Sequence, residues 1–389
     1  MEKNNLIEIS DKRICSGCGA CLNSCPRQCI NFKLDEEGFI YPVIEKEKCI
    51  DCHLCEKVCP WRRKEFIERK IEKNNIFYSA QLYNKKTLSM VSSGGVSWAV
   101  AKKVINKEGS VYGAAQFGVD RIKHIRALTL SDIELIRRSK YLQSDIGRSY
   151  TLAKEDLNSG RQVLFTGTGC QIAGLLSFIG KNYDNLLTID VVCHGVPSLK
   201  VWRRYRLETE KKTNSSMEKL VFRDKSAGWK NNQYLQVYKN GKYEKQLSID
   251  HPFHQGYLMG MYSRPSCGNC QFNLLPRLSD ITLADYWEYD GELFKDTQEL
   301  GISLVCCNTE KGYDFIQSLE EDVALEPTTE KKALASCKYL NNIPKENVNR
   351  DFFLSDLEKH GFYHAWRKYI KKRKSCLFAV KKLLKGIKL

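Results

Sequence analysis

The sequence predicts a small α+β module, then an α/β domain with a mainly parallel sheet, and finally a basic helical C-terminal tail. A cysteine pattern that occurs twice within the first 60 residues defines the module. From Phe77 onward, apolar segments of strand length alternate with segments of helical periodicity, which is typical of a parallel sheet flanked by helices. Residues 341–389 are expected to form a basic amphipathic helical segment, the tail, because residues 367–389 carry ten Lys and Arg and no acid.

The module contains two identical cysteine runs. Cys-x2-Cys-x2-Cys-x3-Cys-Pro begins at Cys15 and begins again, 34 residues later, at Cys49. The first three thiolates of such a run wrap one cubane cluster, and the cysteine before proline ligates the other cluster. The pattern resembles the bacterial two-cluster ferredoxins and predicts a ferredoxin module over residues 1–66. The predicted ligands of the two [4Fe–4S] clusters are Cys15, Cys18, Cys21 and Cys59 for the first, and Cys49, Cys52, Cys55 and Cys25 for the second.

Other features of the module, and of the segment after it, follow from the sequence. Structural zinc usually takes two separated Cys-x2-Cys pairs, so triplets followed by Cys-Pro favour clusters over zinc. Cys29 is a ninth cysteine that neither cluster needs, and we expect a small buried side chain there. Alternation over 30–34 and 39–44 around a turn at 35–38 predicts a β-hairpin. A charged, helix-like linker should follow the module, to about Asn75.

The α/β domain is expected over residues 77–340. A capping box at Ser131 and Glu134 predicts the start of one of its helices. A turn at Lys239–Lys242 predicts a hairpin within residues 220–250. The other predicted helices are 96–105, 170–179 and 311–319, and the predicted strands are 111–117, 122–130, 161–166, 186–192, 281–287 and 302–307.

Four further cysteines stand where a ligand site is expected. Cys170 and Cys193 each follow a predicted parallel strand, and ligands bind at that edge of open α/β sheets. Cys267-x2-Cys270 would complete a set of four thiolates for a third [4Fe–4S] cluster. The alternative is that Cys170 and Cys193 are small core residues and that the Cys-x2-Cys pair binds no cluster.

Two glycine segments precede predicted helices. Gly167-x-Gly169 resembles the start of a dinucleotide fingerprint, but Ile172 stands at the third glycine position. Ser93-Gly94-Gly95 would offer free N–H groups to a phosphate. Plain turns explain both segments equally well. A flavin would convert the one-electron chemistry of the clusters into two-electron chemistry.

Two titratable residues are candidates for chemistry near these segments. His194, next to Cys193, is a candidate proton donor, with a structural role as the alternative. Asp285 follows an apolar strand and would either line the cleft or cap a turn.

Six segments together resemble the β subunit of coenzyme F420-reducing hydrogenase and its dehydrogenase relatives. The resemblance covers roughly residues 77–330, and it depends on the order of the segments. They are Ser93-Gly94-Gly95, Lys140-Tyr141-Leu-Gln-Ser144, Gly167-Thr-Gly169-Cys170-Gln171, Cys193-His194-Gly-Val-Pro-Ser198, Cys267-x2-Cys270 and Asp280-Ile-Thr-Leu-Ala-Asp285-Tyr-Trp287.

The resemblance implies a non-covalent FAD beside a [4Fe–4S] cluster. The cluster ligands would be Cys170, Cys193, Cys267 and Cys270. The residues near the flavin would be Gly94, Gly95, Lys140, Tyr141, Ser144, Gly167, Gly169 and Asp285. Ala284 stands where the family often has glycine, and its methyl group would narrow the pocket, so the family's acceptor does not carry over.

Composition and charge bear on location and partners. The first ten residues lack an apolar signal core, and seventeen cysteines without such a signal indicate a reducing cytoplasm. The net charge of +16 resides largely in the tail, and no basic–aromatic interleaving indicates nucleic acid. The tail would contact an anionic membrane surface or an acidic partner, or pack on its own domain. Its apolar residues at helical spacing are Trp366, Ile370, Leu377, Val380, Leu384 and Ile387.

Together these features predict a cytoplasmic, iron–sulfur, FAD-dependent oxidoreductase, and a peripheral membrane contact is one of the alternative roles of the tail. Electrons would pass from reduced ferredoxin or another redox protein through the clusters to FAD and an organic acceptor, or in reverse. The deazaflavin coenzyme is one candidate acceptor. The alternatives are an electron-transfer subunit of a larger redox complex and a non-catalytic iron–sulfur binding protein.

Overall fold

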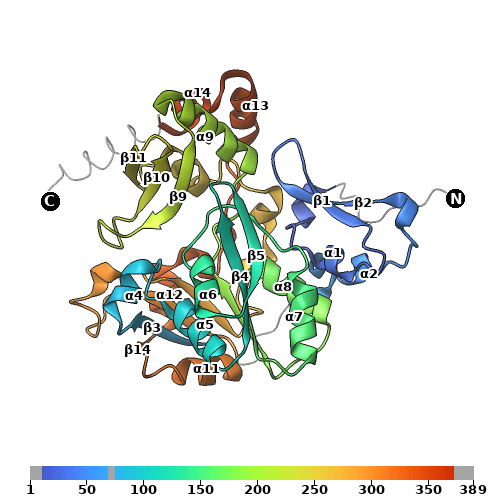
Figure 1. The fold of residues 1–389 in the computed structure, drawn as a ribbon, viewed down its shortest axis with the longest axis vertical. Coiled ribbons are helices and arrows are strands. Elements are labelled where there is room, and N and C mark those ends of the chain that lie inside the picture. Colours follow the sequence, from blue (N-terminus) through green and yellow to red (C-terminus); the bar gives the residue numbers. More distant parts are fainter. Residues whose placement is uncertain (1–10, 69–74, 372–389) are drawn as a thin grey trace.

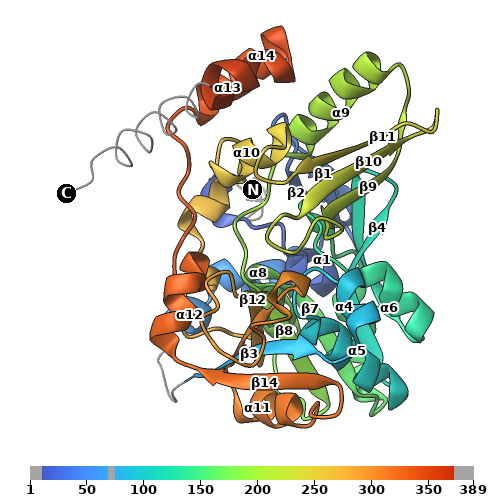
Figure 2. The ribbon, with the colours of Figure 1, turned by 90° about the vertical axis from the view of Figure 1, so that its left-hand side faces the viewer.

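The computed structural model describes residues 11–68 and 75–371, and its largest element is a nine-stranded sheet (Figures 1 and 2). The strands are β3 (Ile76–Leu82), β4 (Ser110–Phe117), β5 (Arg121–Ala127), β6 (Ser144–Asp145), β7 (Val163–Thr168), β8 (Leu186–Val191), β12 (Ile281–Asp285), β13 (Ser303–Cys307) and β14 (Val323–Thr328). Their order across the sheet is β14-β3-β13-β12-β8-β7-β4-β5-β6.

The sheet is mixed, which corrects the prediction of a mainly parallel one. Parallel pairing joins β12, β8, β7 and β4 in the centre and β5 to β6 at one edge. The pairs β4–β5, β12–β13, β13–β3 and β3–β14 are antiparallel. Strands joined by a tight turn, such as β4 and β5, must run antiparallel, whereas parallel neighbours need a crossover. The sequence shows the strands but not which of them lie side by side.

Helices cover both faces of this sheet. On one face, α5 (Val96–Asn106), α6 (Leu130–Ile136) and α11 (Glu310–Gln317) pack over Leu164 and Leu187. On the other, α7 (Ser149–Asn158) and α8 (Gly169–Ile179) pack over Val163 and Phe165. Successive residues of a strand point to opposite faces, so the apolar run of β7 supplies both cores. Two shorter helices, α4 (Lys85–Met90) and α12 (Glu330–Ser336), flank β3.

The start of α6 differs from the prediction. Its capping box is formed by Thr129 and Asp132, two residues before the predicted pair of Ser131 and Glu134. The strand predicted to reach Leu130 therefore ends earlier, at Ala127. The segment contains both Thr-x-x-Asp and Ser-x-x-Glu, and the cap that forms is the one next to the end of β5.

A second unit is built on a three-stranded antiparallel sheet and lies above the large sheet in Figure 2. Half of the buried residues in its core are aromatic, among them Trp202, Tyr234 and Phe253. The β10–β11 pair confirms the predicted hairpin. The elements of this unit are β9 (Met217–Asp224), β10 (Gln233–Tyr238), β11 (Tyr243–Leu247), α9 (Leu199–Thr213), α10 (Pro252–Leu258), α13 (Arg350–His360), α14 (Phe362–Trp366) and a π-helix, η8 (Arg367–Lys371).

The C-terminal segment reaches this second unit. Phe353, Phe362 and Ile370 are buried in its aromatic core, so residues 350–371 pack on the protein itself. The rest of the predicted basic amphipathic tail, residues 372–389, lies outside the described residues, and the domain boundaries remain predictions. Within the described ranges, none of the helices has the length and apolarity needed to cross a bilayer.

The N-terminal module lies at one side of the molecule (Figure 1). The predicted hairpin is present as β1 (Ile30–Leu34) and β2 (Ile40–Ile44). Helices α1 (Ala20–Ser24) and α2 (Leu54–Lys57) carry cysteines of the two runs, and α1 contacts α7 and α8 of the large sheet. Of the predicted linker helix, the described part is α3 (Lys64–Ile67). The remaining elements are the 3-10 helices η1 (Lys12–Ile14), η2 (Lys46–Lys48) and η3 (Pro60–Arg62).

Candidate functional site

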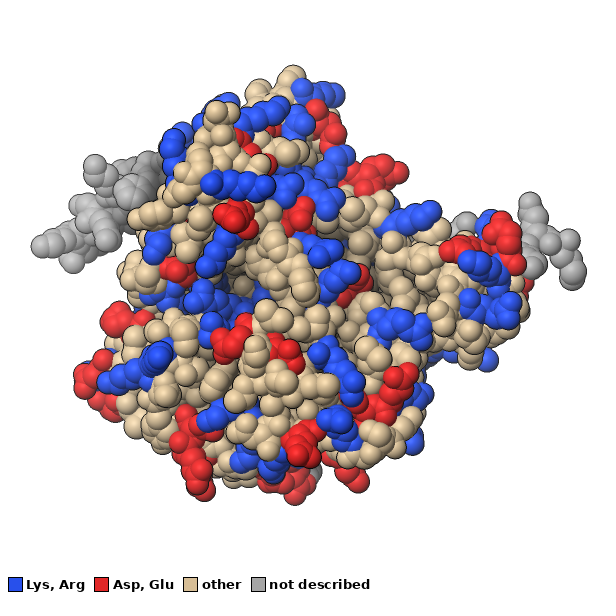
Figure 3. All heavy atoms as spheres, viewed as in Figure 1, with Lys and Arg blue, Asp and Glu red and all other residues tan. Residues whose placement is uncertain are grey.

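A cavity of about 760 Å³ lies between the large sheet and the second unit. Its floor is formed at the ends of β7, β8 and β12, by residues such as Gly167, Val191 and Asp285. Residues of β9 and α10, including Arg223 and Tyr257, form the opposite wall. Lys and Arg side chains gather beside the hollow between the upper and lower parts of the molecule in Figure 3. A cavity of this size accommodates a cofactor-sized ligand.

Most of the site residues predicted downstream of the N-terminal module line this cavity. They are Gly95, Lys140, Tyr141, Ser144, Gly167, Cys170, Cys193, His194 and Asp285. Gly94 and Gly169 lie behind the wall, where a Cβ atom would collide with the carbonyl oxygen of Ala80 or of Phe272, respectively. Both glycines therefore allow close backbone packing. The methyl group of Ala284, the departure from the family pattern, lines the cavity.

The four downstream cysteines converge beside the cavity. Cys170 lies in the first turn of α8 and Cys193 in the loop after β8, while Cys267 and Cys270 belong to a 3-10 turn, η4 (Pro265–Asn269), and its C-cap. Burial raises the pKa of Cys270 to about 12, and the nearby thiols of Cys170 and Cys193 contribute to the shift. Burial and Cys170 likewise raise the pKa of Cys193 to about 11. These thiols are close enough to influence one another, as ligands of one cluster must be.

Backbone amides already point at two of these sulfurs. The amide of Gly195 donates to Cys193 Sγ at 3.3 Å, and the amide of Val196 donates to Cys267 Sγ at 3.4 Å. Gly195 has a φ of +106°, which only glycine adopts without strain, so the turn depends on this residue. Hydrogen bonds to cluster sulfurs are a main determinant of reduction potential.

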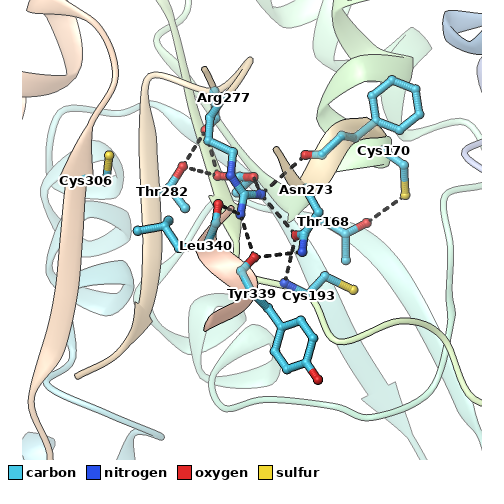
Figure 4. Close-up of polar contacts among 12 residues, drawn as sticks. Thr168, Cys170, Cys193, Asn273, Arg277, Thr282, Cys306, Tyr339 and Leu340 are labelled. Carbon is cyan, nitrogen blue, oxygen red and sulfur yellow. Dashed lines mark hydrogen bonds and ion pairs between the residues drawn. The ribbon is translucent and has the colours of Figure 1, made fainter. Parts of the chain in front are cut away.

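A buried polar network supports the loops that carry these cysteines (Figure 4). Arg277 and Asp190 form an ion pair of 3.0 Å, with side chains 0% and 2% exposed. Asn273 Oδ1 accepts from Arg277 at 3.2 Å and from the amide of Cys193 at 3.4 Å. Arg277 also donates to the carbonyl oxygen of Phe272 at 3.3 Å. The network thus ties the end of β8, before Cys193, to the segment that follows Cys270.

The N-terminal cysteines lie in the two groups that their spacing predicts. Burial raises the pKa of Cys21 well above its usual range, and the thiols of Cys18, Cys15 and Cys59 contribute to the shift. The second group, Cys25, Cys49, Cys52 and Cys55, lines one small cavity.

Cys29 is buried at the side of the second group. Its Sγ lies 3.3 Å from Cys25 Sγ, and its exposed fraction is 2%. Burial and this contact raise the pKa of the Cys29 thiol to about 12. The structure therefore confirms the expected burial of the ninth cysteine and places it in contact with a predicted ligand.

The donor sets fit clusters better than single ions. Among the described residues, no three His, Cys, Asp or Glu side chains are close enough to hold one metal ion. A tetrahedral zinc site with Zn–S bonds of about 2.3 Å would require that proximity. A [4Fe–4S] cluster contains its own iron and sulfide and therefore needs its thiolates farther apart. Three groups of four thiols match that chemistry, and the one carboxylate that the described residues place on a group thiol is Asp51, 3.5 Å from Cys49 Sγ.

The first thiol group lies against α8, whose N-terminus carries Cys170. A Cβ atom at Gly174 would lie 3.0 Å from Cys18 Sγ, so helix and thiol are in contact. The Tyr150 hydroxyl contacts the carbonyl oxygens of Cys18 at 2.7 Å and Gln171 at 2.8 Å. Burial raises the pKa of Cys170, while a hydrogen bond from Ser16, beside Cys15, opposes the shift. The three groups therefore follow one another from the surface to the cavity.

The cavity is electropositive. Its described lining contains five cations, Arg137, Arg138, Lys140, Arg223 and Lys230, against a single acid, Asp285. Arg223 and Asp285 neutralise each other through two hydrogen bonds of 2.7 and 3.1 Å. Asp285, for which sequence left two roles open, therefore lines the cavity as half of an ion pair.

Among these five cations, Lys140 has the pKa that is lowered most. Its Nζ donates to the carbonyl oxygens of Ile136 at 2.7 Å and Arg137 at 2.8 Å, and no described carboxylate pairs with it. Burial, with the nearby charges of Arg137 and Arg138, lowers its pKa to about 7. An anion in the cavity would reverse that shift, and the N-terminus of α5 at Gly95 adds its positive dipole end to the same wall.

Histidines also line the cavity. His194 Nε2 lies 2.9 Å from the carbonyl oxygen of Leu258, and burial lowers the pKa of the ring. In the neutral form Nε2–H donates to that oxygen, so Nδ1 is an acceptor and His194 is better suited to take up a proton than to give one.

His124 was missed by the sequence reasoning because no motif surrounds it. Its Nδ1 lies 2.7 Å from Ser144 Oγ and its Nε2 lies 2.9 Å from the Thr166 carbonyl oxygen. Burial lowers its pKa to about 4. Arg223 was missed for the same reason. The alternation of β9 shows that Arg223 is in a strand and not that it faces Asp285.

Two family models match separate parts of the chain. Residues 160–332 match the C-terminal region of the beta subunit in the coenzyme F420 hydrogenase/dehydrogenase family, and residues 14–62 match a 4Fe-4S dicluster domain. The resemblance seen in the motifs is thereby confirmed, with a dicluster match in the N-terminal part and a beta-subunit match in the α/β part. It is an iron–sulfur protein related to an oxidoreductase subunit.

A search of solved structures finds a chain of the F420-reducing [NiFe] hydrogenase complex from Methanosarcina barkeri, in a xenon-derivatized form. The two chains are 18% identical, and the match covers 68% of this chain and 89% of that chain with a TM-score of 0.45. The curated proteins contain no match to the chain.

Proposed function

We propose that this protein is an iron–sulfur flavoprotein oxidoreductase that exchanges electrons between a redox protein, such as ferredoxin, and an organic acceptor. The observation that carries the proposal is that Cys170 and Cys193 belong both to the third thiol group and to the wall of the 760 Å³ cavity. A cluster held there would lie beside whatever the cavity binds.

The chain's own residues fit FAD in that cavity. Lys140, Arg138 and the N-terminus of α5 would hold the diphosphate, because the two side chains are half-buried cations without described carboxylate partners. The apolar and aromatic parts of the lining, including Trp98 and Tyr141, suit planar rings. When bound, FAD supplies the conversion between one-electron and two-electron chemistry. His194 Nδ1 would hold the proton that accompanies the second electron.

The thiol groups suggest a direction from surface to interior. Cys52 is exposed, so the second group is accessible to a partner protein. Cys18, in the first group, contacts α8, and Cys170 at the start of α8 belongs to the third group. Electrons would enter near Cys52 and reach the cavity wall at Cys170 and Cys193.

The test is an anaerobic purification followed by iron, sulfide and flavin analysis. Three clusters require about twelve iron atoms per chain, four for each cluster. We expect about that number together with one FAD. Cys193→Ala should lose about four of these atoms. The matched control, Cys307→Ala, removes a thiol that is buried in the core of the large sheet and should retain all of them.

Each component of the proposal has its own contradicting result. Protein that contains clusters but no flavin, and that does not bind added FAD, would exclude the flavoprotein. About eight iron atoms in the wild type, unchanged in Cys193→Ala, would exclude the third cluster.

A second candidate function is an electron-transfer subunit of a larger redox complex, and the match to a beta-subunit family favours it. Reduction of acceptors by the purified chain separates the two. Turnover with a panel of organic acceptors, the deazaflavin coenzyme included, supports the enzyme. Cluster reduction without any turnover supports the subunit.

A further inference from the structure

Arg264 joins the N-terminal module to the rest of the chain. It lies three residues before Cys267, and its side chain is buried, with a residue exposure of 1%. Its Nε donates to the carbonyl oxygen of Cys15 at 2.7 Å and its Nη2 to that of Ile40 at 2.8 Å. The guanidinium also lies 4.3 Å from the centre of the Tyr41 ring. These three partners belong to the module, and a fourth, Gln143 of the α/β domain, accepts from Arg264 Nη1 through its Oε1 at 3.0 Å.

The charge of Arg264 lacks a carboxylate partner among the described residues. Three other buried arginines each have one: Arg277 pairs with Asp190, Arg223 with Asp285 and Arg350 with Glu37. An isolated buried charge is costly, so a compensating anion is expected. The group in position to provide it is Cys15 Sγ, 3.8 Å from Arg264 Nη2.

We propose that Arg264 is the counter-ion of the cluster held by Cys15, Cys18, Cys21 and Cys59, and that it raises the reduction potential of that cluster above that of the second. One-electron reduction adds a negative charge and breaks no bond. A fixed positive charge in a poorly solvated site therefore stabilises the reduced form more than the oxidised form. No arginine contact of this kind is present at the second thiol group among the described residues, and Cys52 there is exposed.

This difference would make transfer from the exposed cluster to the inner one energetically downhill. The proposal depends on the two N-terminal clusters, which the dicluster-domain match supports, and not on FAD or a third cluster. A flavin analysis that finds no FAD would therefore not affect the proposal about Arg264. Conversely, an unchanged cluster potential in Arg264→Gln would not affect the flavoprotein proposal.

The experiment is an anaerobic potentiometric titration of the full-length holoprotein, monitored by electron paramagnetic resonance. The signal of the second cluster is assigned by its change in Cys52→Ser. In Arg264→Gln, the ratio of reduced to oxidised first cluster at a fixed potential should fall at least tenfold, which is about 59 mV for one electron. Arg264→Lys should shift the same signal in the same direction by less, because lysine keeps the charge without the planar contacts.

Arg350→Gln is the matched control. Arg350 also joins the module to the second unit, but it does so through Glu37 and the carbonyl oxygen of Ser263 instead of through Cys15. We expect its first-cluster potential to equal that of the wild type. An equal fall in Arg350→Gln would show that Arg264 acts only by holding the module in place. An unchanged potential in an iron-replete Arg264→Gln would overturn the proposal. If Arg264→Gln loses iron, the same titration is made on Arg264→Met, which also removes the charge, and an unchanged potential there would overturn the proposal.

Discussion

Asp190→Asn should be one of the most destabilising single changes in the α/β domain. The Asp190 carboxylate accepts from Arg277 Nη1 at 3.0 Å, from Ser279 Oγ at 2.8 Å and from Thr282 Oγ1 at 2.5 Å. The substitution keeps the shape of the side chain and leaves the Arg277 charge buried without its partner. Removing one member of a buried ion pair costs about 3–5 kcal/mol.

The surface pair Lys102–Asp322 provides the control. The two side chains are 31% and 36% exposed, and a pair of that kind contributes only about 0–1 kcal/mol. At about 2 °C per kcal/mol, Asp190→Asn should lower the apparent Tm of the anaerobic holoprotein by about 6–10 °C, and Asp322→Asn by about 2 °C or less. Circular dichroism at one heating rate provides the comparison. A loss in Asp190→Asn no greater than that in Asp322→Asn would refute the reasoning.

Three further outcomes are expected. A bound anion favours the charged form of Lys140, so the affinity of the flavin-free protein for FAD, measured by calorimetry, should fall as pH rises through about 7. This dependence of affinity on pH should be weaker in Lys140→Met. In the exposed control Lys359→Met it should equal that of the wild type. His124 has a pKa of about 4 in the folded protein, below its value of about 6.5 in the unfolded chain. The unfolded state therefore binds the proton first, and stability decreases as pH falls from about 6.5 to about 4. Melting curves should show a smaller decrease of Tm over this range in His124→Gln, and an equal decrease would contradict the assignment. Gly174→Ala should lower iron content, because its Cβ would lie 2.9 Å from the Tyr150 hydroxyl and 3.0 Å from Cys18 Sγ, and full iron with an unchanged cluster spectrum would show that the contact is tolerated.

The structure shows why sequence reasoning found thiols more readily than it found the pocket. The first three cysteines of each run are close together in sequence, so their spacing alone indicates that they bind one face of a cluster. The cavity instead combines residues from Ser16 to Tyr339, and each of its walls is an ordinary strand end or helix start. His124 and Arg223 have no motif around them, because their roles come from the partners across the cavity.

Glycines show a related limit. The sequence marks Gly94, Gly95, Gly167 and Gly169 as candidate cofactor contacts. The structure separates them, since Gly95 and Gly167 line the cavity, whereas Gly94 and Gly169 permit close packing of the backbone. A glycine that avoids a collision within the fold looks the same in sequence as one that admits a ligand.

The sequence by itself determined the two N-terminal thiol groups, the hairpin between them, the strands β7 and β8 and the helix α8, because spacing and periodicity act between near neighbours. The tertiary structure alone decided that the sheet is mixed, that Cys170 and Cys193 line the cavity, and that Arg264 reaches Cys15 across 249 positions of the chain. These outcomes depend on which strands lie side by side and on how the two units and the module pack. The free energy of such contacts comes from burial and charge pairing between segments that are distant in sequence.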